Sequence, residues 1–209
     1  MDNTSTVKHV PEVTIAGGPE QFAVVGKQIL LTCQYNAFPP ATEVLWIKDG
    51  TVLARNTSVK INNSRVTIPH HNETHEQLSI NATTSQDAGN YTCLVINDVG
   101  NSWDTISMIS QVAPEISKHP KDATNMEGQV VVFSCLVEGN PPPSVRWTKD
   151  GERLNTTANS RLTESVMNNN HSLTITGVHR SDAGQYRCVA NNIVNSSTSL
   201  AATLKVYCE

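Results

Sequence analysis

Three histidines and a glutamate that lie close together are the side chains best suited to chemistry. His70, His71 and His75 flank Glu73, and imidazole nitrogens together with a carboxylate oxygen are typical ligands of Zn²⁺. The same residues are also typical of an exposed polar loop, because they lie in a long insertion before a predicted strand. We interpret them as such a loop and predict that the chain has no metal site and no cofactor.

No other short motif in the chain indicates catalysis. The sequence has no glycine-rich phosphate loop, no nucleophile elbow and no paired Cys-x-x-Cys metal knuckle. Its net charge is −4 and it has no basic stripe, which argues against a nucleic-acid partner. The longest apolar runs are strand-sized, so we predict no transmembrane segment in this chain. We therefore predict that these 209 residues are not an enzyme.

An internal repeat predicts the strands and domains on which these side chains lie. The string Asp-Ala-Gly-x-Tyr-x-Cys occurs at residues 87–93 and again at 182–188, each time downstream of a Cys…Trp pair. Short alternating runs separated by turn residues predict strands throughout. We predict an all-β chain with a tail at 1–8 and domains at 9–112 and 113–207. Because Pro114 biases Ala113 toward extended geometry, we expect an elongated tandem.

Together these residues resemble the immunoglobulin fold over nearly the whole chain. In each repeat the Cys…Trp…Cys pattern is joined by a tyrosine two residues before the second cysteine. The Leu-x-Ile runs and the turn from Asn97 to Gly100 make the chain similar to the intermediate, or I-set, class. In the second unit Asn195 replaces the usual glycine of that turn, and asparagine tolerates the same backbone. The resemblance implies two immunoglobulin-like β-sandwiches.

The resemblance also implies structural roles for the repeated residues. Disulfides Cys33–Cys93 and Cys135–Cys188 are expected to join the two sheets of each sandwich, each stabilising its unit by about 4 kcal/mol. The expected core aromatic residues and ion pairs are Trp46, Tyr91, Trp147 and Tyr186, with Arg65–Asp87 and Arg161–Asp182. Cys208 falls outside the pattern: it could form an interchain disulfide, pair with a residue in a part of the native chain beyond Glu209, or stay a free thiol, and we favour the second.

Acceptor sequences for N-glycosylation are dense in this chain. The nine Asn-x-Ser/Thr sites are Asn3, Asn56, Asn62, Asn72, Asn81, Asn90, Asn155, Asn170 and Asn195. Four cysteines at positions that would meet across a sandwich core indicate an oxidising compartment. We expect an extracellular fragment of a longer, membrane-anchored glycoprotein of the cell surface.

The clearest functional signal is an apolar set of side chains predicted to face outward from the first unit. Alternation from Trp46 and Cys93 places Leu45, Ile47, Leu94 and Ile96 outward on neighbouring strands. Ile106 and Met108 on the last strand are expected to extend the patch, unless a bulge there reverses their parity. The second unit has mostly polar residues there: Arg146, Thr148, Val189 and Asn191. Such a patch is typical of an interaction surface. Alternatively, a neighbouring domain or loop covers it.

The acceptor asparagines bear on how open this patch is. Asn56, Asn62, Asn72 and Asn81 are expected to lie away from it, whereas Asn90 lies at its rim. We predict that the chain is a recognition or cell-adhesion module that binds protein partners, including itself, through the outer face of domain 1. The alternative is the ligand-binding ectodomain of a receptor such as a receptor tyrosine kinase, with a kinase further along the native chain. A third, weaker candidate is a structural module of an extracellular-matrix or muscle-type array.

Overall fold

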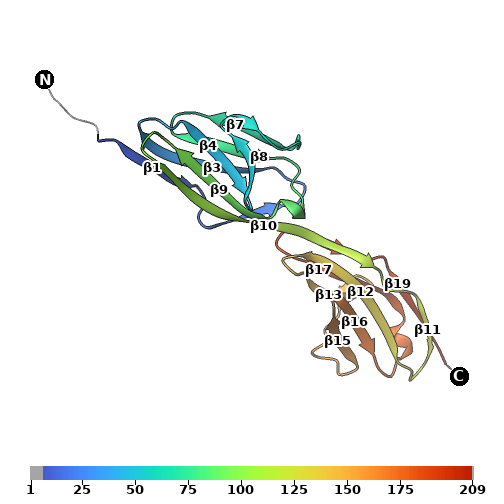
Figure 1. Cartoon of the computed structure of the whole chain (residues 1–209). Helices are drawn as coiled ribbons and strands as arrows, with labels where there is room; N and C mark the ends of the chain where they lie inside the picture. The colour runs from blue at the N-terminus through green and yellow to red at the C-terminus, as the bar shows by residue number, and fades with distance from the viewer. Residues whose placement is uncertain (1–6, 209) are drawn as a thin grey trace. The chain divides into compact units, whose positions relative to one another are not determined.

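The computed structural model describes residues 7–208 and consists of strands with two short 3₁₀ turns (Figure 1). The described residues divide into two compact units, and the division falls between Gln111 and Val112. The prediction of an all-β chain is confirmed. Within residues 7–208, no helix is long and apolar enough to cross a bilayer.

Unit 1 is built from ten strands and one 3₁₀ turn. They are β1 (His9–Ile15), β2 (Glu20–Val24), β3 (Ile29–Phe38), β4 (Glu43–Lys48), β5 (Thr51–Arg55), β6 (Ser58–Val59), β7 (Val66–His71), β8 (His75–Ile80), η1 (Ser85–Asp87), β9 (Gly89–Ile96) and the first part of β10 (Asn101–Lys118). One sheet has the order β1-β3-β8-β7, and the other runs β10-β9-β4-β5-β6 with β2 paired to β10. Side chains from both sheets form one buried core, with Leu31 and Leu78 facing Trp46 and Val95.

Unit 2 repeats this plan. Its elements are the last part of β10, then β11 (Ala123–Met126), β12 (Val131–Asn140), β13 (Ser144–Lys149), β14 (Glu152–Arg153), β15 (Leu162–Met167), β16 (Asn170–Ile175), η2 (Arg180–Asp182), β17 (Gly184–Asn191), β18 (Ser196–Thr198) and β19 (Ala202–Tyr207). One sheet runs β15-β16-β12-β10 and the other β11-β19-β17-β13-β14, with β18 paired to β17. Phe133 and Trp147 lie in its core.

Strand β10 crosses the domain boundary that we predicted between residues 112 and 113. It runs as one strand from Asn101 through Pro114 to Lys118 (Figure 1). Its first part pairs with β9 and its last part with β12. Extended geometry at Ala113 and Pro114 is compatible with a strand, which explains why a segment that reads as a linker is part of a sheet.

A disulfide joins the two sheets inside each unit. Cys33 on β3 bonds to Cys93 on β9, and Cys135 on β12 bonds to Cys188 on β17. Trp46 pairs with Cys93 in the sheet register, and Trp147 pairs with Cys188. Both tryptophans are at most 1% exposed. Each small core is thus filled by one indole beside one disulfide.

A tyrosine closes the base of each sandwich. The hydroxyl of Tyr91 donates to the carbonyl oxygen of Asp87 at 2.6 Å, and that of Tyr186 donates to Asp182 at 2.7 Å. Burial raises the pKa of both phenols, and the carboxylate of the same aspartate adds to the shift. These hydroxyls therefore stay protonated and keep donating to the backbone at physiological pH.

A two-pronged ion pair accompanies each tyrosine. The guanidinium of Arg65 donates to both carboxylate oxygens of Asp87 at 2.7 and 3.1 Å, and Arg161 binds Asp182 at the same distances. Burial of these aspartates opposes ionisation. Hydrogen bonds from the arginine and from a backbone N–H outweigh that effect, so the pKa of each carboxyl is lower than usual.

Candidate functional site: the outer apolar face of unit 1

The outward surface of strands β4, β9 and β10 carries a row of apolar side chains. In the sheet register Leu45 lies opposite Leu94, and Leu94 lies opposite Trp103. Trp103 is 64% exposed, which is a large fraction for an indole. Ile47 and Ile96 are half-buried on the same side of their strands. We call Leu45, Ile47, Leu94, Ile96 and Trp103 the apolar face.

Two residues predicted for this surface lie in the core instead. Ile106 is 0% exposed and Met108 is 2% exposed, and both belong to the buried cluster of unit 1. Ile106 pairs with Tyr91 and Met108 with Gly89, so they share the inward side of the sheet with Tyr91. Our prediction for Ile106 and Met108 was wrong, because the strand alternation of β10 runs opposite to the one we assigned.

Leu45 was also predicted to be exposed, and the structure buries it at 6% exposure. It does face outward, but its neighbours cover it. Leu94 lies on one side in the register and Arg55 on the other. The guanidinium of Arg55 reaches the carboxylate of Glu43 at 3.4 Å, and Glu43 precedes Leu45 by two residues on the same side of β4. The aliphatic stem of Arg55 therefore shields Leu45 from water.

Trp103 is the residue of the apolar face that sequence reasoning missed. In the structure Leu204 of unit 2 pairs with Gly184 as Met108 of unit 1 pairs with Gly89. The sequence repeat alone does not give this match, because its offset of 95 residues matches Met108 to Thr203. Leu204 is a core residue of unit 2. Matching the two strands by this position makes Met108 inward and Trp103 outward.

The corresponding surface of unit 2 has a different character. The row that matches Leu45, Leu94 and Trp103 consists of Arg146, Val189 and Thr198. Its neighbours Thr148 and Asn191 are polar as well. Of the two units, only unit 1 combines two leucines with an exposed tryptophan in this row.

The acceptor asparagines surround the apolar face unevenly. Asn62, Asn72 and Asn81 lie on segments connected to β7 and β8, in the opposite sheet. Asn56, which we expected away from the face, follows β5 at the edge of the same sheet, and its Oδ1 accepts a hydrogen bond from the N–H of Val44 at 2.8 Å. The described acceptors with exposed side chains are Asn62, Asn72, Asn81, Asn90, Asn155 and Asn195, whereas Asn56 and Asn170 are half-buried. Asn3 lies outside the described residues.

The histidine cluster lies on the hairpin that β7 and β8 form. The Nε2 atoms of His70 and His75 are 3.0 Å apart, and their rings stack at 4.7 Å. Asn72 presents its Nδ2 to both rings at 3.2 Å, while its Oδ1 accepts backbone N–H bonds. Among residues 7–208, no group of three or more His, Cys, Asp or Glu side chains is placed to hold a metal ion.

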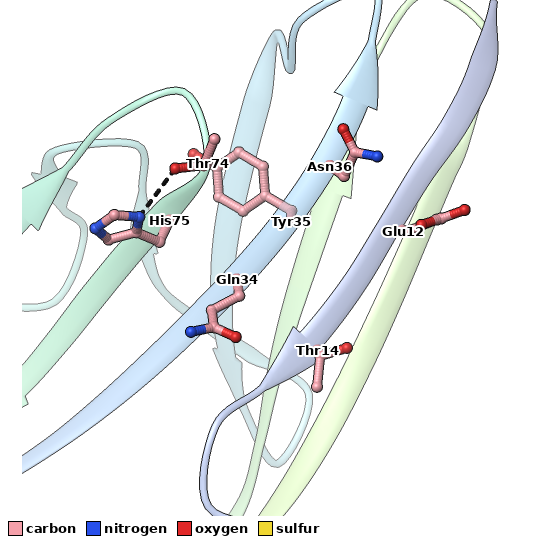
Figure 2. Close-up of a pocket in the computed structure, with 7 residues that line it drawn as sticks. All are labelled: Glu12, Thr14, Gln34, Tyr35, Asn36, Thr74 and His75. Carbon is pink, nitrogen blue, oxygen red and sulfur yellow. Dashed lines mark hydrogen bonds between the residues drawn. The ribbon is translucent and has the colours of Figure 1, made fainter.

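A groove of about 480 Å³ lies beside this hairpin on strands β1 and β3 (Figure 2). Its lining residues are Glu12, Thr14, Gln34, Tyr35, Asn36, Thr74 and His75. All of them except Tyr35 and His75 are exposed polar side chains. Ligand pockets are usually concave and mostly apolar, so this groove resembles an ordinary solvated sheet surface more than a binding pocket.

Cys208 is exposed and is the one cysteine of the described residues outside a disulfide. Its sulfur lies against the guanidinium of Arg180.

Family models match both units. The model described as immunoglobulin I-set domain matches residues 114–206, and the one described as immunoglobulin domain matches residues 10–97. Neuroglian of Drosophila melanogaster is 32% identical over 193 residues, which are 91% of this chain and 14% of that protein. Human Hemicentin-1 is 31% identical over 199 residues, which are 95% of this chain and 3% of that protein. The chain thus spans a small part of the length of these relatives.

Solved structures show the same fold. A titin I-band fragment, I67–I69, superposes with a TM-score of 0.78 at 24% identity, covering 94% of this chain and 65% of the fragment. The two-domain fragment IG1+IG2 of DIP-gamma gives a TM-score of 0.72 at 22% identity, covering 96% and 99%. These likenesses confirm the prediction of two immunoglobulin-like sandwiches.

Proposed function

Because the chain belongs to the immunoglobulin family of tandem I-set domains, we propose that it is an extracellular recognition module of a cell-surface glycoprotein. It binds protein partners through the apolar face of unit 1. One observation carries this proposal: a row of Leu45, Leu94 and Trp103 in unit 1 stands where unit 2 has Arg146, Val189 and Thr198. Tryptophan is enriched among the residues that carry most of the binding energy at interfaces, and Trp103 is 64% exposed.

The compartment follows from the covalent chemistry of the chain. Two disulfides inside small sandwiches persist in oxidising surroundings. Six of the described acceptor asparagines have exposed side chains and can carry glycans on the folded units: Asn62, Asn72, Asn81, Asn90, Asn155 and Asn195. Both features support the assignment to the outside of the cell.

A second copy of the chain is the partner that the face suits best. Its centre is apolar and its border carries both signs of charge, with Glu43 and Arg55 at one side and Lys48 and Asp49 at the end of β4. A face with this composition can meet its own copy around a two-fold axis, apolar centre on apolar centre. Two different proteins with this fold bind one another in the solved complex of Dpr11 IG1 with DIP-gamma, which supports a protein partner for the fold.

Bead aggregation and sedimentation test this function directly. Beads coated with the chain are expected to aggregate, and the free chain to dimerise with rising concentration. Trp103→Arg places a charge at the exposed end of the row and should abolish both effects. Thr198→Arg is the matched control, because it makes the same change at the corresponding exposed strand position of unit 2.

Three results would contradict parts of this proposal. A wild-type chain that stays monomeric and leaves beads dispersed would rule out self-recognition. Equal aggregation of wild type and Trp103→Arg would rule out the apolar face. Binding of the clustered chain to cells that Trp103→Arg abolishes, without self-association, would assign the face to a different protein partner.

A further inference from the structure

A carboxyl group is buried in the core of unit 1 where an apolar side chain is expected. Glu76 on β8 is 0% exposed and lies on the inward side of the strand, in alternation with Leu78 and Ile80. It pairs with Cys33 in the sheet register. A buried ionised carboxylate is costly unless it is paired and fully hydrogen-bonded, so its contacts decide which form it takes.

Glu76 has one strong partner and one unsatisfied oxygen. Its Oε2 lies 2.6 Å from Nδ1 of His71, on the neighbouring strand β7. Its Oε1 is buried without a hydrogen-bond partner among the described residues. At 2.6 Å the two heavy atoms share a single proton, which sits either on the carboxyl or on the imidazole.

The other groups around this pair do not neutralise a negative charge. Tyr35 from β3 faces it, and the pKa of that phenol rises to about 12 through burial and then through the charge of Glu76. A cavity of about 260 Å³ borders Tyr35 and His71, and its facing sheet contributes the uncharged Val44 and Asn56. Glu73 lines the same cavity from the hairpin turn, and its side chain is exposed to water. Burial raises the pKa of Glu76 to about 8.

The same residues hold the hairpin of β7 and β8. The hydroxyl of Tyr35 donates to the carbonyl oxygen of Asn72 at 2.6 Å. The backbone N–H of Tyr35 donates to the carbonyl oxygen of Thr74 at 2.8 Å. On the outward side the imidazoles of His70 and His75 stack. The turn at residues 72–74 is thus fastened to β3 immediately beside the buried carboxyl.

We propose that Glu76 and His71 form a proton-binding site that keeps the β7–β8 hairpin closed. While the pair holds its proton, the carboxyl is neutral or matched by an imidazolium, and the hairpin packs on β3. When the proton leaves, an unpaired carboxylate stays in the core, and opening of the hairpin brings it to water. This site is separate from the apolar face and does not depend on the proposed recognition function.

The direction of the pH effect follows from linkage. Glu76 is ionised in an open or unfolded chain above its ordinary pKa of about 4.5, whereas in the closed unit its pKa is about 8. Between these values the open state releases a proton that the closed state keeps, so closure weakens as the pH rises. Over pH 6.5 to 8 the opening equilibrium should increase about tenfold, and the effect should level off above pH 8.

Hydrogen exchange of the whole chain, resolved by peptide and corrected for intrinsic rates, tests this site. Amides of residues 66–80 should lose protection about tenfold between pH 6.5 and 8 in the wild type, and residues 120–208 serve as the internal control. Glu76→Gln keeps the shape without the charge and should remove the pH dependence. Glu73→Gln, in the exposed turn of the same hairpin, should keep it. Glu76→Leu is a second neutral variant in case the amide packs poorly.

A carboxyl carbon NMR titration gives an independent readout. The signal lost in Glu76→Gln should titrate near pH 8. A Glu76 signal that titrates below pH 5 would overturn the proposal. Parallel loss of protection in the wild type and both Glu76 variants would overturn it as well, because the opening would then not depend on this proton.

Discussion

Units 1 and 2 place the same residue types at their scaffold positions and differ on their outer surface. Each has a sheet-to-sheet disulfide, a buried tryptophan, a tyrosine bonded to the backbone and an arginine on an aspartate. On the outer surface, however, Leu45, Leu94 and Trp103 of unit 1 correspond to Arg146, Val189 and Thr198 of unit 2. Since the scaffold residues are the same in both units, the exposed Trp103 is not part of the shared scaffold, which supports our proposal that it serves binding.

A second difference lies opposite the first cysteine of each disulfide. Glu76 occupies this position in unit 1 and His171 occupies it in unit 2. The strand neighbour of Glu76 is His71, whereas that of His171 is Val166. Because one position holds an acid and the matched position holds a base, we expect the stability of the two units to change in opposite directions with pH.

Loss of a disulfide should be the largest effect, and it should be equal in the two units. The loops closed by Cys33–Cys93 and Cys135–Cys188 span 60 and 53 residues, so replacing either pair by alanine should cost about 4 kcal/mol of that unit's unfolding free energy. Denaturant titration with peptide-resolved hydrogen exchange measures each unit separately. Clearly unequal costs would show that the scaffolds are not equivalent.

Replacing Trp103 by its counterpart in unit 2 should weaken binding without changing the stability of the fold. Trp103→Thr introduces the residue of unit 2 at a position that is 64% exposed, so the unfolding free energy should shift by less than about 0.5 kcal/mol. Self-association should weaken by about 2 kcal/mol, or roughly 30-fold, because an indole anchor is lost. Ile193→Ser removes an apolar side chain of unit 2 that is even more exposed, at 78%, and should leave association unchanged. Equal losses of self-association in both variants would indicate non-specific hydrophobic association.

Breaking the arginine–aspartate pair should cost each unit about the same smaller amount. Arg65→Ala and Arg161→Ala leave a largely buried carboxylate without its charged donor, for a loss of about 1.5 kcal/mol. Although burial opposes ionisation, the hydrogen bonds lower the pKa of Asp87 and Asp182 in the folded units. The pair therefore stabilises the fold above pH 4 and loses its contribution as the pH falls through the lowered pKa. Acid titration of both variants against wild type checks this.

Replacing His171 should have the smallest effect and the opposite pH dependence to Glu76. Burial lowers the pKa of His171 below its usual 6.5. In this pH range the imidazole of His171 binds a proton in the unfolded chain but not in the folded unit. Unit 2 therefore loses stability as the pH falls from about 6.5 toward the lowered pKa. His171→Val should flatten this acid slope, as measured by denaturation at pH 5 and pH 7. A slope that persists in the variant would assign it to other groups.

Sequence reasoning predicted the scaffold well because its signals are local and repeated. The Cys…Trp…Cys spacing and the tyrosine before the second cysteine define which residues of β4 and β9 face inward. The same alternation correctly placed Leu94 and Ile96 on the outward side of β9. It failed for Ile106 and Met108, because the turn after β9 decides the register of β10 and no cysteine in β10 marks the inward side.

Burial could not be predicted in the same way. Leu45 faces outward yet is covered, because Arg55 crosses from β5 to Glu43. Glu76 looks like part of an exposed polar loop in sequence, yet β8 begins at His75 and turns its carboxyl into the core. Both outcomes depend on neighbours from other strands, which sequence spacing does not contain.

The sequence by itself determined that this protein is a pair of disulfide-bonded β-sandwiches, because alternation and the repeated cysteine pattern are properties of the chain alone. Only the tertiary structure decided that Trp103 completes the apolar face and that Glu76 and His71 meet inside unit 1. Strand pairing brings together residues that are distant in sequence, in a register that sequence spacing does not give. Exposure and protonation both depend on those partners, so the sites for binding and for protons emerge only when the sheets are assembled.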